Sequence, residues 1–169
     1  SEAKELWPLM DVSDVLGAAF LPSDGQASPS DIAQALAKGA RNQGGTILEG
    51  IQVTGVRSEN SRVTGIDTPE GPVDCEILVN CAGQWAREVG QLAGVNVPLV
   101  SVQHQYLITE PIDGVTSDLP TLRDPDRLTY FKEEVGGLVM GGYEPNPVGW
   151  AQGGFPENFS FSLLGSDWD

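Results

Sequence analysis

The sequence is poor in cysteine, histidine and positive charge. Its 169 residues include 2 cysteines, 1 histidine and 9 lysines and arginines, against 24 aspartates and glutamates, for a formal net charge of -15. Two cysteines are too few for a disulfide framework, and one histidine leaves no cluster with metal-ligand spacing. The negative charge disfavours binding to nucleic acid or to an anionic membrane. We therefore expect no metal site and no nucleic-acid partner.

Long hydrophobic runs are also lacking. No apolar stretch approaches the roughly 20 residues that a membrane-spanning helix needs, so we expect no membrane partner. The hydrophobic share of 40% is enough for the core of one domain or for parts of two, and we expect Cys75 and Cys81 to be free thiols within it. The chain begins with Ser1 rather than Met, and Leu163 and Leu164 near its end have no following element to cover them. We expect a piece of a longer protein.

The clearest predicted element is a helix over residues 28–43. Ser28 is a good N-cap, Pro29 suits the first helical position, and Asp31 completes a spacing like that of a capping box. The apolar side follows helical spacing and consists of Ile32, Ala35, Leu36, Gly39 and Ala40. Shorter helices are expected over 3–10, interrupted at Pro8, and over 84–93.

The rest of the pattern favours short strands. We expect one strand over 15–21, a β-meander over 46–80 that ends in a strand at 76–80, and a longer strand over 98–109. A further hairpin is expected around Gly136-Gly137. Helix and strand patterns mix before Gly94, whereas only strands follow Pro98. The fold class is therefore α+β, in which the 28–43 helix packs with the 76–80 strand and His104 lies on a separate, largely antiparallel sheet.

Four segments in order resemble a known family. They are PSDGQASPSDIAQALAKGARNQGG, IQVTGVRSENSRVTGIDTPEGPVDCEILVNCAGQWAREVG, VPLVSVQHQYLITEP and LTYFKEEVGGLVMGGYEPNP. Together they resemble the amine-oxidising flavoproteins of the D-amino-acid-oxidase superfamily, within it the dimethylglycine and sarcosine dehydrogenase and oxidase group. The resemblance implies interleaved domains: 1–27 as an edge of the substrate domain, 28–97 as part of a Rossmann-like FAD-binding layer, and 98–169 as part of the substrate-binding domain.

The resemblance also implies catalytic residues. His104 is the only histidine, and periodicity alone favours an inert histidine on an apolar strand face. The family's HQY strand presents its histidine to the flavin and the substrate, where it can hold the carboxylate or help to remove the amine's proton. Tyr130 matches a family active-site tyrosine, although an ordinary strand aromatic is the alternative. Tyr106 shares the His104 face and is a candidate wall of the substrate pocket.

The cofactor implied by the resemblance is FAD. The family places VTG at 53–55 beside the adenosine part, with Val53 as the contact, and places Ala82 and Gly83 against the cofactor where a strand gives way to a helix. The family's G-x-G-x-x-G motif, which holds the pyrophosphate, is missing from these 169 residues. We therefore expect FAD in the full-length protein and none on this chain alone.

The function implied is oxidation of an N-methylated glycine, dimethylglycine or sarcosine, by hydride transfer to the flavin. Two alternatives stay open: another substrate of the superfamily, such as proline, glycine or glycerol 3-phosphate, or a catalytically inactive regulatory or interaction subunit with the same fold. The electron acceptor is either oxygen or an electron-transfer protein. The expected location is the bacterial cytoplasm or, in a eukaryote, the mitochondrial matrix.

Overall fold

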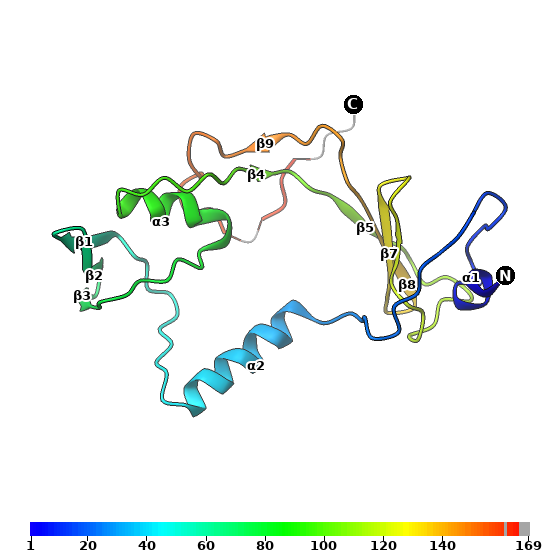
Figure 1. Cartoon of the computed structure of the whole chain (residues 1–169), viewed down its shortest axis with the longest axis horizontal. Coiled ribbons are helices and arrows are strands. Elements are labelled where there is room, and N and C mark those ends of the chain that lie inside the picture. The colour runs from blue at the N-terminus through cyan, green and yellow to red at the C-terminus, as the bar shows by residue number, and fades with distance from the viewer. Residues whose placement is uncertain (161, 166–169) are drawn as a thin grey trace. The chain divides into compact units, whose positions relative to one another are not determined.

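The computed structural model of the chain describes residues 1–160 and 162–165 (Figure 1). In chain order its elements are α1 (Glu2–Leu6), α2 (Pro29–Asn42), β1 (Gly55–Glu59), β2 (Arg62–Thr68), β3 (Gly71–Asp74), the short 3-10 helix η1 (Gly83–Trp85), α3 (Ala86–Leu92), β4 (Ser101–Val102), β5 (Tyr106–Ile108), β6 (Leu122–Asp124), β7 (Thr129–Glu134), β8 (Gly137–Gly142) and β9 (Gly149–Trp150). All strand pairs among these elements are antiparallel. The α+β class is confirmed.

Contacts divide the chain into two compact units that alternate along the sequence. Unit 1 contains residues 1–46 and 104–147, and unit 2 contains residues 47–103 and the chain from 148 onward. The unit boundaries fall at 46, 103 and 147. The assignment of 1–27, 28–97 and 98–169 to substrate and FAD domains, which the resemblance implies, stays a prediction. The final residues of the segment expected over 98–169, from 166 on, lie outside the described part of the chain.

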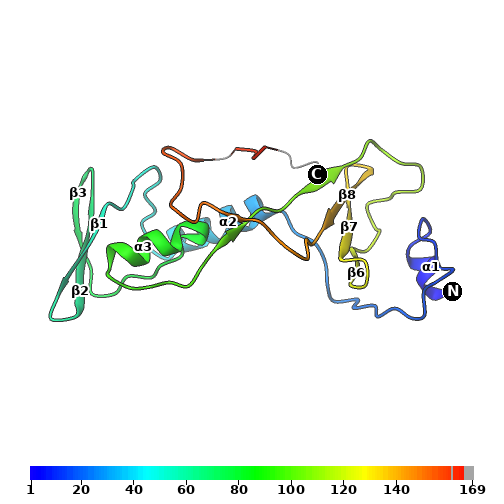
Figure 2. The same ribbon diagram turned by 90° about the horizontal axis from the view of Figure 1, so that it is seen from above.

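Unit 1 is built on a four-stranded sheet with the order β5-β8-β7-β6. Figure 2 shows β6, β7 and β8 side by side. The expected hairpin is confirmed: β7 and β8 are joined by a turn in which Val135 and Gly136 have φ angles of 51° and 79°. Positive φ at both central residues is the geometry of a tight two-residue hairpin turn, and Gly136 adopts it without steric cost.

The core of unit 1 forms around Trp7. Its ring lies 6.1 Å from that of Phe131 on β7, and its indole Nε1 donates a 2.7 Å hydrogen bond to the carbonyl of Pro120. Trp7, Leu119, Leu138 and Val139 are the buried apolar side chains of the described chain. The α1 helix ends just before Pro8, as predicted. No strand forms over 15–21, so that prediction is wrong.

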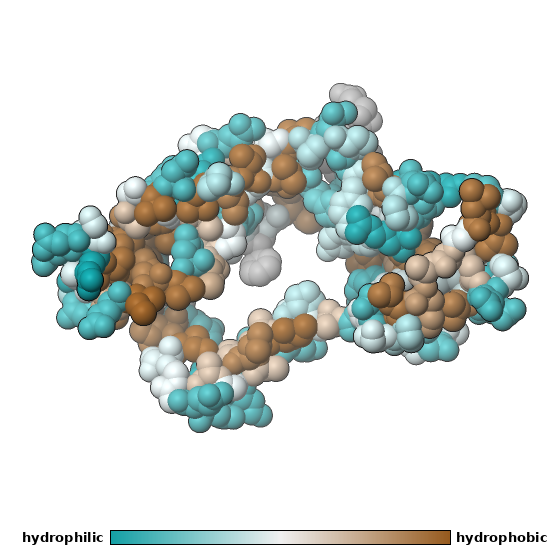
Figure 3. Space-filling view, viewed as in Figure 1, coloured by the Kyte–Doolittle hydropathy of each residue, from teal (hydrophilic) through white to brown (hydrophobic). Residues whose placement is uncertain are grey.

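Helix α2 begins and ends as the sequence predicted. The Ser28 hydroxyl accepts a 3.3 Å hydrogen bond from the Asp31 N–H, Pro29 opens the helix, and Gly44 follows it with a φ of 88°. The helix buries none of its residues, and Leu36 is 70% exposed. Figure 3 shows apolar side chains uncovered along α2.

Unit 2 contains the predicted meander, in the order β1-β2-β3. Asn60 and Ser61 have φ angles of 49° and 61°, the left-handed geometry that joins β1 to β2 in a tight hairpin. Arg57 on β1 lies across Gly65 and reaches Asp74 on β3 at 2.8 Å. The hydrogen bond to Asp74 raises the pKa of Arg57 above its ordinary value.

Three sequence-based expectations are wrong: the strand at the start of the meander, the strand at its end, and the core position of the two cysteines. Residues 46–50 and 76–80 form no strands, so the predicted helix–strand pair with 76–80 does not exist. Ile77 and Val79 are 81% and 72% exposed, because no neighbouring strand covers them within the described chain. Cys81 is exposed and Cys75 half-buried, so neither is a core thiol, although both are free.

An aromatic cluster connects α3 to the last segment of unit 2. Trp85 lies 5.3 Å from Phe155, and Trp150 on β9 lies 4.6 Å from Phe159, measured between ring centroids. The β9 strand pairs with β4, and the Arg87 guanidinium donates to the carbonyl of Ala151 at 3.1 Å. These contacts tie α3, β4 and β9 into one body.

Replacing Gly90 in α3 with alanine should destabilise unit 2. The added methyl group would stand 2.6 Å from Val97 Cγ2 and 2.8 Å from the Val95 carbonyl, so the returning chain would have to move. We expect a loss of about 1–3 kcal/mol in unfolding free energy, measured by urea denaturation. Gly39→Ala is the matched control, because nothing lies within 4 Å of its added methyl group and an exposed helical alanine gains about 1 kcal/mol. Equal effects in both variants would contradict the packing argument.

Candidate active site

His104 and Tyr130 lie together in unit 1. The Nε2 atom of His104 is 3.3 Å from the Tyr130 hydroxyl, and the two rings are nearly parallel, with 16° between their planes and 6.2 Å between their centroids. His104 lies two residues before β5, in the stretch between β4 and β5, and Tyr130 is the second residue of β7. Either group can donate in this hydrogen bond, depending on which imidazole nitrogen carries the proton. The pair can therefore accept a proton from a ligand or pass one on.

A third aromatic ring, that of Tyr143, lies beside the His104–Tyr130 pair. The Tyr143 ring lies 5.8 Å from that of His104 and 5.7 Å from that of Tyr130, so the three rings form a triangle. The guanidinium carbon of Arg123 stands 4.9 Å from the centre of the Tyr143 ring. This distance is within the range of a cation–π interaction. One cation thus lies at the edge of the three-ring cluster.

The sheet register explains why these side chains meet. Arg123 on β6 pairs with Tyr130 on β7, Tyr130 pairs with Gly141 on β8, and Gly141 pairs with Tyr106 on β5. Directly opposed residues of antiparallel strands point to the same face of a sheet. We call the face that carries this row of four residues the tyrosine face.

Gly141 makes room for the Tyr130 ring. A methyl group at this position would stand 2.1 Å from Tyr130 Cζ and 2.2 Å from its hydroxyl oxygen. The phenol therefore lies directly over the β8 backbone, which only a residue without a side chain allows. Its hydroxyl is thereby set at hydrogen-bonding distance from His104.

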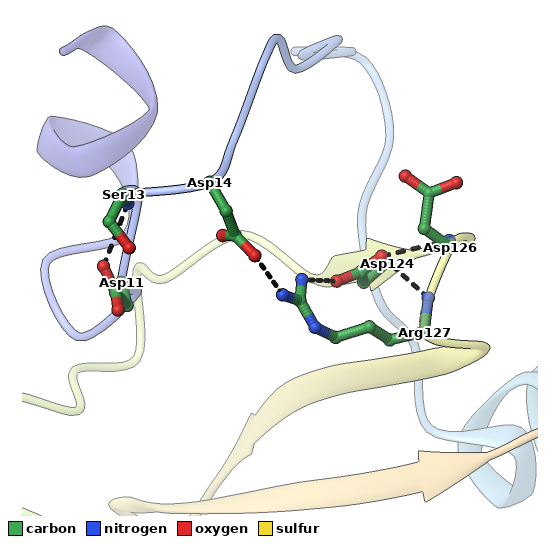
Figure 4. A network of polar contacts seen from close by, with 6 residues as sticks. All are labelled: Asp11, Ser13, Asp14, Asp124, Asp126 and Arg127. Carbon is green, nitrogen blue, oxygen red and sulfur yellow. Dashed lines mark hydrogen bonds and ion pairs between the residues drawn. The ribbon is translucent and has the colours of Figure 1, made fainter.

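A polar network fixes the turn between β6 and β7 (Figure 4). The Asp124 carboxylate accepts hydrogen bonds from the backbone N–H groups of Asp126 and Arg127, at 3.0 and 3.1 Å, and from the Arg127 guanidinium at 2.8 Å. The same guanidinium also donates to Asp14. Because Asp124 follows Arg123 directly, the network holds the strand ends that carry Arg123 and Tyr130.

The network should make unfolding depend on pH on the acid side. The side-chain hydrogen bond from Arg127, followed by its backbone N–H, lowers the pKa of Asp124. A lowered folded pKa adds stability above the ordinary aspartate value of about 3.9, and this stability is lost as the pH falls through the folded value. Arg127→Gln should therefore flatten the rise in unfolding free energy that occurs below the ordinary aspartate value of about 3.9. The matched control is Arg62→Gln in unit 2, and an unchanged slope in Arg127→Gln would contradict this origin.

Tyr106 belongs to the tyrosine face by register, but its side chain is 63% exposed. The expected single strand over 98–109 is divided in two, since β4 pairs with β9 in unit 2 and β5 pairs with β8 in unit 1. His104 stands at this division.

Val53, Ala82 and Gly83, expected at the cofactor, all belong to unit 2. The Ala82 N–H donates to the Asn80 side chain at 3.2 Å, and the Asn80 amide donates to the Ala86 carbonyl at 2.9 Å, so Asn80 fixes this loop against the start of α3. Gly83 has a φ of 56°, and nothing beyond its chain neighbours lies within 4 Å of the position that a Cβ would occupy. The backbone there is open to close approach by a flat ligand.

Three residues of the cluster were not predicted from the sequence: Arg123, Gly141 and Tyr143. A glycine pair within the strand pattern, Gly141-Gly142, was the available signal, because glycine inside a strand often marks a close approach of another group. The RDPDR run over 123–127 reads as a turn, and nothing in it indicates that its first residue faces an aromatic cluster. Among the described residues, no group of acidic, histidine and cysteine side chains is arranged to hold a metal ion.

Comparison with known proteins identifies the class. The model of the family described as FAD dependent oxidoreductase, abbreviated DAO, matches residues 1–164, so the chain belongs to this family. The chain is 38% identical to mitochondrial sarcosine dehydrogenase of Homo sapiens over 174 aligned positions, which cover 100% of the chain and 19% of that protein. It is also 38% identical to the mitochondrial pyruvate dehydrogenase phosphatase regulatory subunit of Mus musculus, over 98% of the chain and 19% of that protein.

A solved structure supports the same fold. The crystal structure of L-proline dehydrogenase from P. horikoshii matches with a TM-score of 0.78 and 32% identity, over 87% of the chain and 40% of that protein. The resemblance expected from the sequence is thereby confirmed at the level of the family. The chain spans about one fifth of the length of the curated relatives named above, at 19% of each. Within residues 1–160 and 162–165, no helix has the length and apolar character needed to span a bilayer.

Proposed function

We propose that this chain is part of an FAD-dependent amine dehydrogenase or oxidase whose substrate is an N-methylated glycine such as sarcosine or dimethylglycine. The observation that carries the proposal is the hydrogen bond between His104 and Tyr130 on an open sheet face, 3.3 Å long. The 38% identity to a sarcosine dehydrogenase over the whole chain supports the substrate class. Oxygen or an electron-transfer protein would accept the electrons, and the location would be the bacterial cytoplasm or the mitochondrial matrix.

In this proposal His104 and Tyr130 prepare the amine for oxidation. A secondary or tertiary amine is protonated near neutral pH, and its lone pair becomes available only after that proton leaves. Neutral imidazole accepts a proton at one ring nitrogen. The hydrogen bond to the Tyr130 hydroxyl holds the His104 ring in place. The rings of Tyr130 and Tyr143 offer the electron-rich faces that attract an N-methyl cation.

Val53, Ala82 and Gly83 are proposed to border the cofactor. The open backbone at Gly83 fits a flat ligand, and the small Ala82 side chain leaves the approach clear. When bound, FAD supplies the acceptor for the hydride that leaves the carbon next to nitrogen. The chain lacks the G-x-G-x-x-G loop that holds a dinucleotide pyrophosphate, so these contacts alone should not retain it.

The proposal is tested with the full-length protein in which this sequence occurs. We expect its absorbance spectrum to show bound flavin, and anaerobic addition of sarcosine or dimethylglycine to bleach it. Proline serves as the comparison substrate, since the solved relative is an L-proline dehydrogenase. If proline reduced the flavin and N-methylated glycines did not, the substrate assignment would be overturned. The 169-residue chain alone should be colourless.

A second candidate function is that of a non-catalytic regulatory subunit. It is supported by the 38% identity to the phosphatase regulatory subunit of Mus musculus, equal to that of the dehydrogenase. The same spectra separate the two functions. A full-length protein that binds flavin but is reduced by none of these amines, or that binds no flavin, favours the regulatory role.

A further inference from the structure

Leu128 has a backbone conformation that leucine rarely adopts. Its φ angle is 54°, in the left-handed region, where the Cβ atom crowds a neighbouring carbonyl oxygen. The residue lies in the turn between β6 and β7, directly before β7, and it is 39% exposed. Glycine or asparagine would take up this conformation at a lower cost. Burial of the side chain therefore explains little of the conformation, and the contacts of the Leu128 backbone matter more.

The Leu128 carbonyl is bonded to the backbone of the third aromatic residue of the candidate site. It accepts a 2.7 Å hydrogen bond from the Tyr143 N–H. Regular pairing between β7 and β8 ends at Thr129 opposite Gly142, one residue short of this contact. The bond thus extends the β7–β8 pairing by one residue, and the residue that it fixes is Tyr143.

The chain after Tyr143 cannot continue the sheet in the same way. Pro145 and Pro147 follow closely, and proline has no backbone N–H to donate to a neighbouring strand. The next strand, β9, begins only at Gly149. Tyr143 is itself 43% exposed, so side-chain packing alone restrains it weakly. The bond to Leu128 therefore fixes Tyr143 at the point where the sheet gives way to the proline-containing stretch.

The turn that presents the Leu128 carbonyl is held by the polar network (Figure 4). The Asp124 carboxylate accepts hydrogen bonds from the backbone N–H groups of Asp126 and Arg127 and from the Arg127 guanidinium. Asp124 also pairs with Thr129 across β6 and β7, so both ends of the turn are fixed. The chain must reverse within the short segment between them, and the left-handed conformation at Leu128 completes the reversal.

We propose that Leu128 is a positioning residue of the candidate active site: its left-handed backbone directs its carbonyl to the Tyr143 N–H and so sets the Tyr143 ring against His104. This inference rests on the proposed function, because Tyr143 belongs to the pocket proposed for the N-methyl group. Backbone strain that surrounding bonds hold in place is found preferentially at functional sites. A ring that is fixed in advance loses less freedom when a ligand binds. The expected consequence is tighter binding of the amine rather than a faster chemical step.

The kinetic test uses the full-length flavoprotein, reduced anaerobically with sarcosine. Leu128→Pro forces φ to about −65° and should therefore release Tyr143. We expect the half-saturating sarcosine concentration to rise by about three- to tenfold, and the limiting rate of flavin reduction to change by less than about threefold. Leu128→Asn is the matched control, because asparagine tolerates the left-handed conformation, and it should keep both values of the unmodified protein.

A double-variant cycle separates positioning from general damage to the fold. Tyr143→Ala removes the ring and should raise the half-saturating concentration to about the same extent as Leu128→Pro. Adding Leu128→Pro to Tyr143→Ala should then cause no further rise, because no ring is left to be placed. Two effects that simply add would overturn the inference and give Leu128 only a structural role. A loss in Leu128→Asn as large as that in Leu128→Pro would also overturn it.

Hydrogen exchange tests the contact without any substrate. In the full-length protein the Tyr143 N–H should exchange slowly, and Leu128→Asn should preserve this protection. Leu128→Pro should make the exchange roughly three- to tenfold faster, the range expected for one lost hydrogen bond. Leu128→Val, whose branched side chain disfavours a positive φ, should change it in the same direction and replaces the proline variant if that protein does not fold.

The two kinds of failure are distinguishable. Fast exchange of the Tyr143 N–H in the unmodified protein, or unchanged exchange in both Leu128→Pro and Leu128→Val, would refute the positioning contact whatever the enzyme's substrate. A flavoprotein that sarcosine and dimethylglycine do not reduce would instead overturn the proposed function.

Discussion

Removing either member of the His104–Tyr130 pair should slow reduction of the flavin by amine substrate by roughly ten- to a thousand-fold, corresponding to about 1.4–4 kcal/mol at the transition state. The variants are His104→Ala and Tyr130→Phe in the full-length protein. The reason is their mutual hydrogen bond of 3.3 Å, which Phe deletes while keeping the ring. Stopped-flow absorbance across substrate concentrations measures the effect. Flavin content should stay nearly unchanged, because neither residue is placed at the adenosine or the pyrophosphate of the cofactor.

The control for this pair is Thr129→Val. Thr129 directly precedes Tyr130 on β7, and strand alternation points its side chain to the opposite face of the sheet. Valine has nearly the same shape, so the strand should be retained and flavin reduction should stay near the unmodified rate. A Tyr130→Phe protein that reduces its flavin as fast as the unmodified protein would show that the hydroxyl is only a packing group. His104 would then revert to the interpretation of an inert structural histidine.

The second large effect is expected for Gly141→Ala. Its added methyl group would stand 2.1 Å from Tyr130 Cζ, and the ring would have to swing away from His104. Because the obstructing atoms belong to the end of a side chain, the fold can yield at small cost. We therefore expect flavin reduction to fall nearly as far as in Tyr130→Phe, while the unfolding free energy drops by about 1–3 kcal/mol at most.

The neighbouring glycine provides the matched control for this substitution. A methyl group on Gly142 would meet only the Leu128 carbonyl, at 3.8 Å, which is ordinary van der Waals contact. Gly142→Ala should therefore leave both the rate and the stability nearly unchanged. If Gly141→Ala retained the full rate, the position of the Tyr130 ring over β8 would be irrelevant to catalysis. Infrared or NMR observation of the Tyr130 hydroxyl would show directly whether its hydrogen bond to His104 is lost.

Elements specified by local chemistry could be predicted from the sequence. The α2 helix starts where Ser28 and Pro29 predicted, and the β1–β2 hairpin turns at Asn60-Ser61. Both depend on residues close in the chain. The strand expected over 76–80 failed for the opposite reason: its apolar residues suit a strand, but a strand exists only beside a partner, and Ile77 is left 81% exposed.

The candidate site was predictable in part. Resemblance to the family pointed to His104 and Tyr130, and the structure places their polar atoms 3.3 Å apart. Their catalytic role stays a prediction. Arg123 could not be found from the sequence, and the glycine pair at 141–142 indicated only a close approach to a strand, because the importance of both positions arises from sheet register across β6, β7 and β8, and register is set by pairings between distant segments.

The contact of Trp7 with Pro120 also determines the order in which the two units can fold during synthesis. The two residues are 113 positions apart, and the whole of the β1–β2–β3 meander lies between them in the sequence. At roughly 5–20 residues per second, a ribosome needs on the order of ten seconds to reach Pro120 after it has made Trp7. Throughout that interval the indole has no β7 strand to cover it. Unit 1 therefore completes its fold late, whereas the meander can form while synthesis continues, and the nascent segment around Trp7 is the part that a chaperone would have to protect.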